Sequence, residues 1–265
     1  KSGKPAVHLL RPARGLDFAD HVVGLDGTPT PDMWELATGR ELAHETVLEG
    51  RRAEYLETAL DYRIVRTTDA VKPYNNDDHV HTSRDAALLQ AIRKHHGEAP
   101  AVITTSTARY VWDDADVIDY NADDGVVEDG PVSGLKIHGN VLGSNRFKSE
   151  RVGCLVGSNH YGDGFVKRWG AYAGHAVTRE SNPTESPDRT PLSYGDFGDK
   201  ILRHMREHDT LQALMRFGRD AGGATVYVDT NTLPEWAPVH GIGDVTAAAT
   251  GMIGVFRALD ELDAP

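Results

Sequence analysis

One stretch of the sequence, residues 211–230, carries side chains whose types and spacing could do chemistry. Gln212, Arg216 and Arg219 stand at positions i, i+4 and i+7, so on a helix they would share one face. Two guanidinium groups on one face form a rigid cationic fork, which binds phosphate oxygens better than lysines would. The alternative is an exposed helix face whose arginines are only solvated. The surrounding sequence has to distinguish this face from a phosphate-binding pair.

The surrounding sequence predicts the elements that would position these side chains. A helix is expected over residues 200–217, and Asp220-Ala221-Gly222-Gly223 should break it with a turn. Residues 224–228 form a short β-branched and aromatic run, typical of a buried strand. The arginines would then lie on a helix that leads, through a glycine turn, into the sheet. Their side chains should face the edge where open α/β sheets bind ligands, beyond the carboxyl ends of the strands.

This pattern, Q-x-x-x-R-x-x-R before a glycine turn and a strand, resembles motif VI of superfamily 2 helicases. In that family the arginines of the second RecA-like lobe reach the nucleotide held by the first. The resemblance implies that Arg219 is the arginine finger on the γ-phosphate, that Arg216 supports it or links the lobes, and that Gln212 senses the nucleotide. It also implies ATP and Mg as cofactors and DNA or RNA as the partner.

A second chemical stretch lies in residues 139–147, between strands expected at 135–138 and 151–157. Glycine permits close approach of a ligand to the backbone, and Gly143 is followed by the hydrogen-bonding residues Ser144 and Asn145. The position is similar to helicase motif V, which couples the nucleotide to the nucleic-acid track. The motif's arginine is missing and Asn145 replaces its aspartate, so a structural turn is the competing interpretation.

Thr28 and Thr30 carry the third resemblance. They follow a short apolar run at 21–26 and lie in a tight turn, Gly-Thr-Pro-Thr-Pro, at residues 27–31. A strand that ends in small hydroxylated residues resembles helicase motif III, so these threonines would act from the side of the first lobe. A plain strand, turn and helix is the alternative.

The order of apolar runs predicts the fold class. Strands and helices alternate from residue 83 onward, which favours an α/β fold with a mostly parallel, doubly wound sheet. The resemblance makes this a RecA-like lobe over residues 76–265, preceded over residues 1–75 by the end of a first lobe, with the boundary in the loop 70–81. Further strands are expected at 62–67 and 101–105, and further helices at 41–60, 83–96 (ended by Gly97), 164–172 and 244–262.

The run GSNHYGDGFVKRWGAYAG at residues 157–174 resembles helicase-like ATPases of haloarchaeal genomes. Helicases bind ATP through a Walker A loop and a Walker B acid in the first lobe, and the 265 residues contain neither G-x-x-x-x-G-K-[ST] nor D-E-x-[DH]. We therefore expect the chain to be the C-terminal part of a longer protein. Alone it should be inactive, because the first RecA-like lobe supplies the phosphate cradle.

Composition narrows the setting. Forty acidic residues against 28 Lys plus Arg give a net charge of −12, and only 8 residues are lysine, a balance that fits a halophilic protein kept soluble in high salt. No apolar run has the length of a membrane span, so no membrane partner is expected. The single Cys154 lies in an apolar run and predicts a buried thiol in a cytoplasmic protein.

The sequence also offers a candidate metal site and two alternative functions. Asp77, Asp78, His79 and His81 offer metal ligands, but a capped loop before a helix is the better interpretation, and no metal is expected. A degenerate RecA-like lobe that only binds nucleic acid or a partner protein is the first alternative to a motor lobe. The second is an unrelated α/β hydrolase, which would combine Ser158 with His160 but lacks a G-x-S-x-G elbow.

Overall fold

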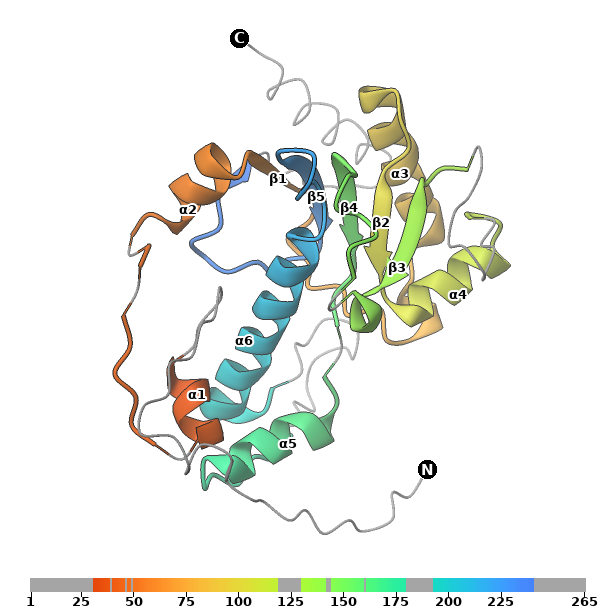
Figure 1. The fold of residues 1–265 in the computed structure, drawn as a ribbon. Helices are drawn as coiled ribbons and strands as arrows, with labels where there is room; N and C mark the ends of the chain where they lie inside the picture. The colour runs from red at the N-terminus through yellow and green to blue at the C-terminus, as the bar shows by residue number, and fades with distance from the viewer. Residues whose placement is uncertain are drawn as a thin grey trace. The chain divides into compact units, whose positions relative to one another are not determined.

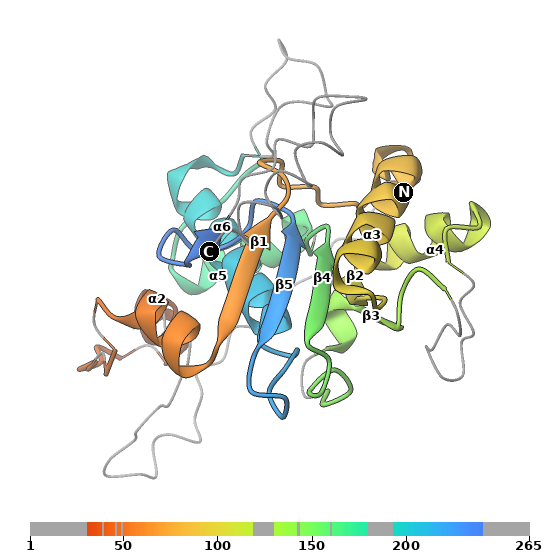
Figure 2. The ribbon, with the colours of Figure 1, turned by 90° about the horizontal axis from the view of Figure 1, so that it is seen from above.

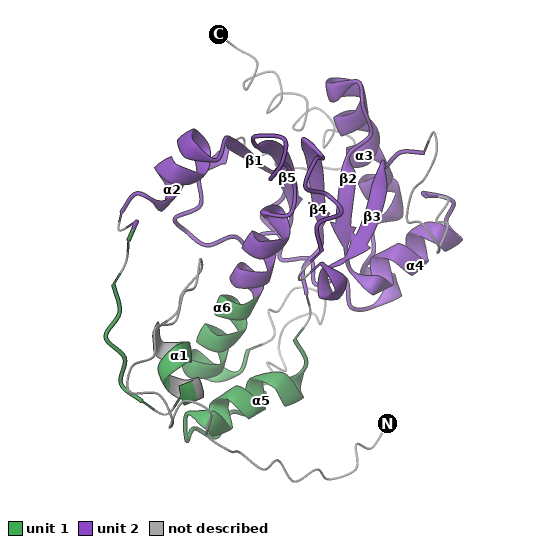
Figure 3. Ribbon diagram, viewed as in Figure 1, with its two compact units in different colours: residues 1–47, 161–205 green, residues 48–160, 206–265 purple. Residues whose placement is uncertain are grey.

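The computed structural model describes residues 31–38, 40–45, 47–48, 50–118, 130–141, 144–159, 161–179 and 193–240. The chain divides into two compact units (Figure 3): unit 1 comprises residues 1–47 and 161–205, and unit 2 comprises residues 48–160 and 206–265. The strand predicted at 21–26, the threonines Thr28 and Thr30, and the helix predicted at 244–262 lie outside the described residues.

A six-stranded sheet in the order β3-β2-β4-β5-β1-β6 forms the centre of unit 2 (Figures 1 and 2). Every pairing in it is parallel. The strands are β1 (Tyr62–Arg66), β2 (Ala101–Thr104), β3 (Gly134–Ile137), β4 (Val152–Val156), β5 (Ala224–Asp229) and β6 (Val239–His240). The predicted α/β class with a parallel sheet is confirmed, and the architecture is consistent with a RecA-like type of fold; the short β6 was not predicted.

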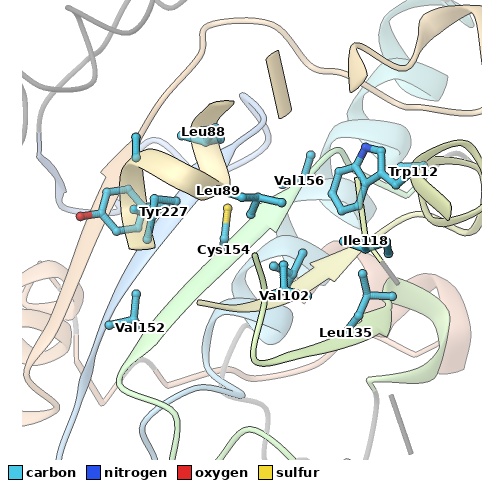
Figure 4. Packing of buried hydrophobic residues seen from close by; sticks show 14 of the residues in the cluster. Leu88, Leu89, Val102, Trp112, Ile118, Leu135, Val152, Cys154, Val156 and Tyr227 are labelled. Carbon is cyan, nitrogen blue, oxygen red and sulfur yellow. The ribbon is translucent and has the colours of Figure 1, made fainter. Parts of the chain in front are cut away.

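Helices cover the two faces of this sheet through separate apolar clusters. On one face, α3 (Thr82–His96) and α4 (Ser106–Asp114) pack on alternate strand residues such as Val102 and Cys154. Figure 4 shows the buried Cys154 thiol beneath Leu89. On the other face, the end of α6 (Gly195–Leu214) packs on the residues that point the opposite way, such as Leu155. This alternation follows from the two-residue repeat of a strand buried on both faces.

The predicted division in the loop 70–81 does not appear in the sheet. β1 pairs with β5 in the register Tyr62↔Ala224 and with β6 in the register Ile64↔Val239. The strand placed before the boundary therefore shares one sheet with the strands placed after it. β1, near the start of unit 2, and β5, near its end, are neighbours in the sheet. Local sequence patterns do not reveal this pairing.

Helix boundaries differ from the predictions at several points. The expected helix over 41–60 is limited to α2 (Arg52–Glu54) and a following π-helical turn η2 (Tyr55–Ala59). Gly97 ends α3 in the left-handed conformation, as predicted. Unit 2 also contains two 3-10 turns, η3 (Asp77–His79) and η4 (His138–Asn140).

Unit 1 has a small core of its own. It contains α1 (Pro31–Thr38), α5 (Asp163–Tyr172) and the first part of α6 by residue number. A Cβ on Gly170 would meet Val177 at 2.3 Å, and a Cβ on Gly198 would meet Tyr194 at 2.4 Å. These two glycines let α5 and α6 approach the cluster formed by Val166, Val177, Tyr194 and Leu202.

Among the helices that the structure describes, none combines the length and the apolar character needed to cross a bilayer.

Candidate functional site

The two arginines do not lie on a helix. α6 ends at Leu214, and the hydrogen bonds tighten from Met215 N→Leu211 O to Arg216 N→Ala213 O, which closes a shorter turn. The prediction of one helical face shared by Gln212, Arg216 and Arg219 is therefore wrong. The helix stops four residues before Gly218, whose left-handed backbone (φ 64°) is incompatible with its continuation.

Glycine is required at position 218 by the turn itself. A Cβ there would lie 2.2 Å from the carbonyl oxygen of Gly223, far inside the contact distance of a carbon and an oxygen. The amide of Gly223 also donates to the carbonyl of Gly218. The two glycines hold residues 218–223 as a closed turn, with Arg219 at its outer side.

This turn docks on the loop that precedes β4. Backbone hydrogen bonds run from Gly218 N to Phe147 O (3.3 Å) and from Asp220 N to Lys148 O (2.7 Å). The rings of Phe147 and Phe217 stack beneath them, 5.5 Å apart and 7° from parallel. The stretch that resembles motif VI and the loop that resembles motif V are therefore one packed structure.

Arg219 joins these two stretches directly. Its Nη2 donates to Asn145 Oδ1 (2.5 Å) and to the backbone carbonyl of Ser144 (3.3 Å). The structure thus brings together three of the residues singled out in the sequence. Gly143 lies outside the described residues, and no hydrogen bond of the described residues joins Gln212 to Arg216 or Arg219.

The positive charge of this pair is not neutralised by the described residues around it. Both acceptors of Arg219 are uncharged, and the carboxylate of Asp220 pairs with Lys148 (2.6 Å) instead. Burial, together with the neighbouring Arg219, lowers the pKa of Arg216. The Nε of Arg216 is buried and has no hydrogen-bond partner among the described residues, and such a group normally finds one.

These arginines lie at the amino ends of β4 and β5, since Ser144 and Asn145 precede β4 and Arg219 precedes β5. Ligands of open α/β sheets bind beyond the carboxyl ends of the strands, and the sequence had led us to expect the arginines at that edge. Their position at the opposite edge means that an anion bound by them is not held in the crevice of this sheet.

The carboxyl edge holds a buried ionic network instead. Asp229, the last residue of β5, pairs with Lys72 and with Arg84 Nη2 (3.3 Å), and accepts a hydrogen bond from Thr67 Oγ1 (2.8 Å). The side chains of Lys72 and Asp229 are 6% and 1% exposed. Burial raises the pKa of Asp229, which the Arg84 charge and the Thr67 hydrogen bond oppose. A carboxylate this deep is stable only with such partners.

A second carboxyl group extends the network. Asp85, on α3, accepts hydrogen bonds from Tyr74 Oη (3.0 Å) and Trp112 Nε1 (3.1 Å), and its Oδ1 lies 4.0 Å from Lys72 Nζ. Burial and the neighbouring Asp229 raise the pKa of Asp85 to about 7. Asp85 is therefore part of the core rather than a solvated complement to the helix dipole.

The segment 70–74 closes this edge. Lys72 and Tyr74 adopt left-handed backbone conformations (φ 44° and 39°), which cost free energy in residues with a Cβ. Hydrogen bonds from the neighbouring strand ends hold the segment down, and the donors are Thr105 Oγ1, Ser158 N, Ser158 Oγ, Thr230 Oγ1 and Asn231 N. The carboxyl edge is thus filled by the chain itself.

Two polar residues near the carboxyl ends of strands, Ser158 and His138, are buried. Ser158 is fully buried, and its hydroxyl donates to the carbonyl of Val71 (3.1 Å). The buried His138 donates from Nε2 to the Gly157 carbonyl (3.1 Å), and burial lowers its pKa. His160 lies outside the described residues. The hydroxyl of Ser158 is held by the carbonyl of Val71, which gives it a structural role, and the pairing of Ser158 with His160 stays a prediction.

The loop before α3 shows no converging ligand set. Asp77, Asp78, His79 and His81 are exposed, and no group of three potential metal ligands occurs within the part of the chain that the structure describes.

Lys72, Tyr74 and Asp229 were not singled out from the sequence. An acidic residue at the end of a buried strand, as in Asp229, is a signal that could have been used. Lys72 gave no such signal, because it lies in an irregular segment whose path only the structure shows.

Comparisons with protein-family models, with curated proteins and with solved structures found no match to this chain.

Proposed function

We propose that this chain is the motor lobe of a nucleic-acid-dependent ATPase, and that it supplies Arg216 and Arg219 to the phosphates of a nucleotide bound by a neighbouring domain. Arg219 is the arginine finger and Arg216 strengthens the local positive field. ATP and Mg would be held by the first RecA-like lobe, because the present sequence has no Walker A or Walker B motif.

One observation carries the proposal. Two neighbouring guanidinium groups have no anionic partner among the described residues, and the Nε of Arg216 is buried without a hydrogen-bond partner. A cationic pair of this kind is stabilised by a bound anion, and the planar guanidinium favours phosphate.

The attached loop supports the coupling role. Asn145 and Ser144 hold Arg219 through neutral acceptors, and Phe147 stacks on Phe217. A shift of the loop therefore changes the position of the guanidinium directly. We propose that nucleic acid acts on ATP hydrolysis through this loop, and that the protein works in the cytoplasm.

The test is the nucleic-acid-stimulated ATPase activity of the full-length protein. Arg219→Ala is expected to lower kcat about 10³-fold or more, while the KM for ATP changes less than about tenfold, because the finger acts mainly in the transition state. Arg219→Lys should recover only part of the rate, since lysine lacks the planar fork. Arg63→Ala, at an exposed position on β1, is the matched control and should leave both constants unchanged.

Unchanged ATPase activity in Arg219→Ala would contradict the motor role. If the full-length protein hydrolyses no ATP and Arg219→Ala weakens its binding to nucleic acid, the alternative of a degenerate lobe that only binds is favoured.

A further inference from the structure

Helix α5 of unit 1 carries a ladder of aromatic rings. Tyr161, Phe165, Trp169 and Tyr172 follow one another at helical spacing. Successive ring centroids lie 4.5, 6.5 and 5.6 Å apart. The four rings therefore form a continuous stripe that begins just before α5, at Tyr161, and continues along the helix.

The first two rings, Tyr161 and Phe165, pack against the core of unit 1, whereas Trp169 and Tyr172 continue the stripe beyond that cluster. Val166 and Gly170 point into the core of unit 1, and both are buried. Phe165 and Trp169 are half-buried, and Tyr172 is 39% exposed at the end of the helix. The rings thus retain accessible surface, which increases toward the carboxyl end of α5.

The sequence along most of α5 is basic, unlike the chain as a whole. Between Asp163 and Glu180, residues 164–179 contain Lys167, Arg168 and Arg179 and no acidic residue, within a sequence whose net charge is −12. All three cations are exposed. On the helix, Arg168 stands three residues after Phe165 and four before Tyr172, so it borders the aromatic stripe.

We infer that the aromatic stripe of α5 binds single-stranded nucleic acid, with bases on its exposed rings and a phosphate near Arg168. Aromatic rings interleaved with cations suit single strands, because unpaired bases expose their faces for stacking while the backbone seeks positive charge. A purely apolar protein partner would not require the local loss of acidic residues. This inference goes beyond the proposed ATPase role and uses neither Arg216 nor Arg219.

The experiment measures binding of a fluorescent oligothymidylate of about 16 nucleotides to the full chain by anisotropy. Tyr172→Ala is expected to weaken binding about five- to one-hundredfold, the usual effect of removing one stacked ring, and Tyr172→Phe should restore most of it. Tyr110→Ala, which removes a tyrosine that is 62% exposed on α4 of unit 2, is the matched control and should bind like the wild type.

Salt dependence gives a second readout. Arg168→Ala should reduce the slope of log K against log[KCl] by about 0.7, the value for one phosphate contact on a single strand. The titration covers the salt range in which the circular dichroism spectrum is unchanged, so that loss of folding is not taken for loss of binding.

Three results would overturn the inference: no binding of the single strand by the wild type, wild-type affinity in both Tyr172→Ala and Arg168→Ala, or equal affinity for a duplex of the same length. A loss of self-association in Tyr172→Ala with unchanged oligonucleotide binding would assign the stripe to a protein contact instead.

Discussion

Arg219 donates a hydrogen bond to Asn145 across 74 residues of sequence, and this contact joins the turn before β5 to the loop before β4. The acceptor is a neutral amide, so it does not neutralise the positive charge of Arg219. The nature of residue 145 should therefore set how much positive potential Arg219 presents to a phosphate.

Two substitutions of Asn145 separate positioning from charge. Asn145→Ala removes the acceptor and should lower kcat of the full-length ATPase about tenfold through looser positioning. Asn145→Asp keeps an acceptor but pairs a carboxylate with Arg219, so we expect a larger loss, about 10²-fold or more. Steady-state kinetics on both variants decide, and equal rates in the two would argue against an electrostatic role for Arg219.

Gly218→Ala should destabilise the fold by about 2–4 kcal/mol, because its Cβ would collide with the Gly223 carbonyl and its backbone is left-handed. Gly222→Ala is the matched control. Its backbone is also left-handed (φ 77°), but nothing lies within 4 Å of the added Cβ, so only the conformational strain of about 1–2 kcal/mol applies. Urea unfolding measures both, and equal losses would show that the close contact at Gly218 is relaxed at little cost.

Removal of Lys72 should leave Asp229 with an incompletely compensated charge in the core. We expect Lys72→Met to cost about 3–5 kcal/mol, and Asp229→Asn to cost a similar amount. The double variant should lose clearly less than the sum of the two, because neither charge is then buried without its partner. Denaturant unfolding of the four proteins gives the cycle, and additive losses would mean that Lys72 and Asp229 are not coupled.

Asp85 predicts a pH dependence of stability. Its pKa is raised to about 7 in the native state and is near 4 in an unfolded chain, so between about pH 4 and pH 7 the native state holds a proton that the unfolded state has released. This contribution is complete below pH 4 and is lost as the pH rises through 7, by at most about 4 kcal/mol.

Asp85→Asn should therefore abolish that slope and be more stable than the wild type above pH 7. The exposed Asp77→Asn serves as its control. Urea unfolding at several pH values measures the slope, and an unchanged slope in Asp85→Asn would assign the effect to another group.

Residues 1–265 alone should show no ATP turnover, because they lack the Walker A and Walker B sequences that cradle phosphate and Mg. A coupled assay on the purified chain, with and without nucleic acid, measures this. ATP hydrolysis that persists after repurification, and that a substitution in this chain abolishes, would contradict the proposal that the first lobe holds ATP and Mg.

The sheet was predictable because its strands have strong local signals. Runs such as Ala101–Thr104 and Val152–Val156 are short, apolar and bounded by turn residues, which is how strands buried on both faces read. The end of α3 was equally predictable, because Gly97 is a glycine that can adopt the left-handed backbone conformation at a helix end. The pairing of β1 with β5 joins residues about 160 positions apart, and no local pattern contains it.

The candidate site was predictable in its residues and not in its geometry. Ser144 and Asn145 were singled out in one stretch and Arg219 in another, and the structure places them in contact. Their helix and their edge of the sheet were wrong, because the reversal at Gly218 depends on a contact with Gly223 that spacing cannot express. The network around Asp229 was missed because Lys72 reaches it from an irregular segment.

The most direct test of the arginine assignment is a structure of the full-length protein with a non-hydrolysable ATP analogue, Mg and nucleic acid. We expect the Arg219 guanidinium to lie within hydrogen-bond distance, about 3 Å, of a γ-phosphate oxygen held by the other lobe, with Arg216 beside it. A nucleotide bound at the carboxyl edge near Lys72, or an Arg219 that still faces solvent in the closed state, would contradict it.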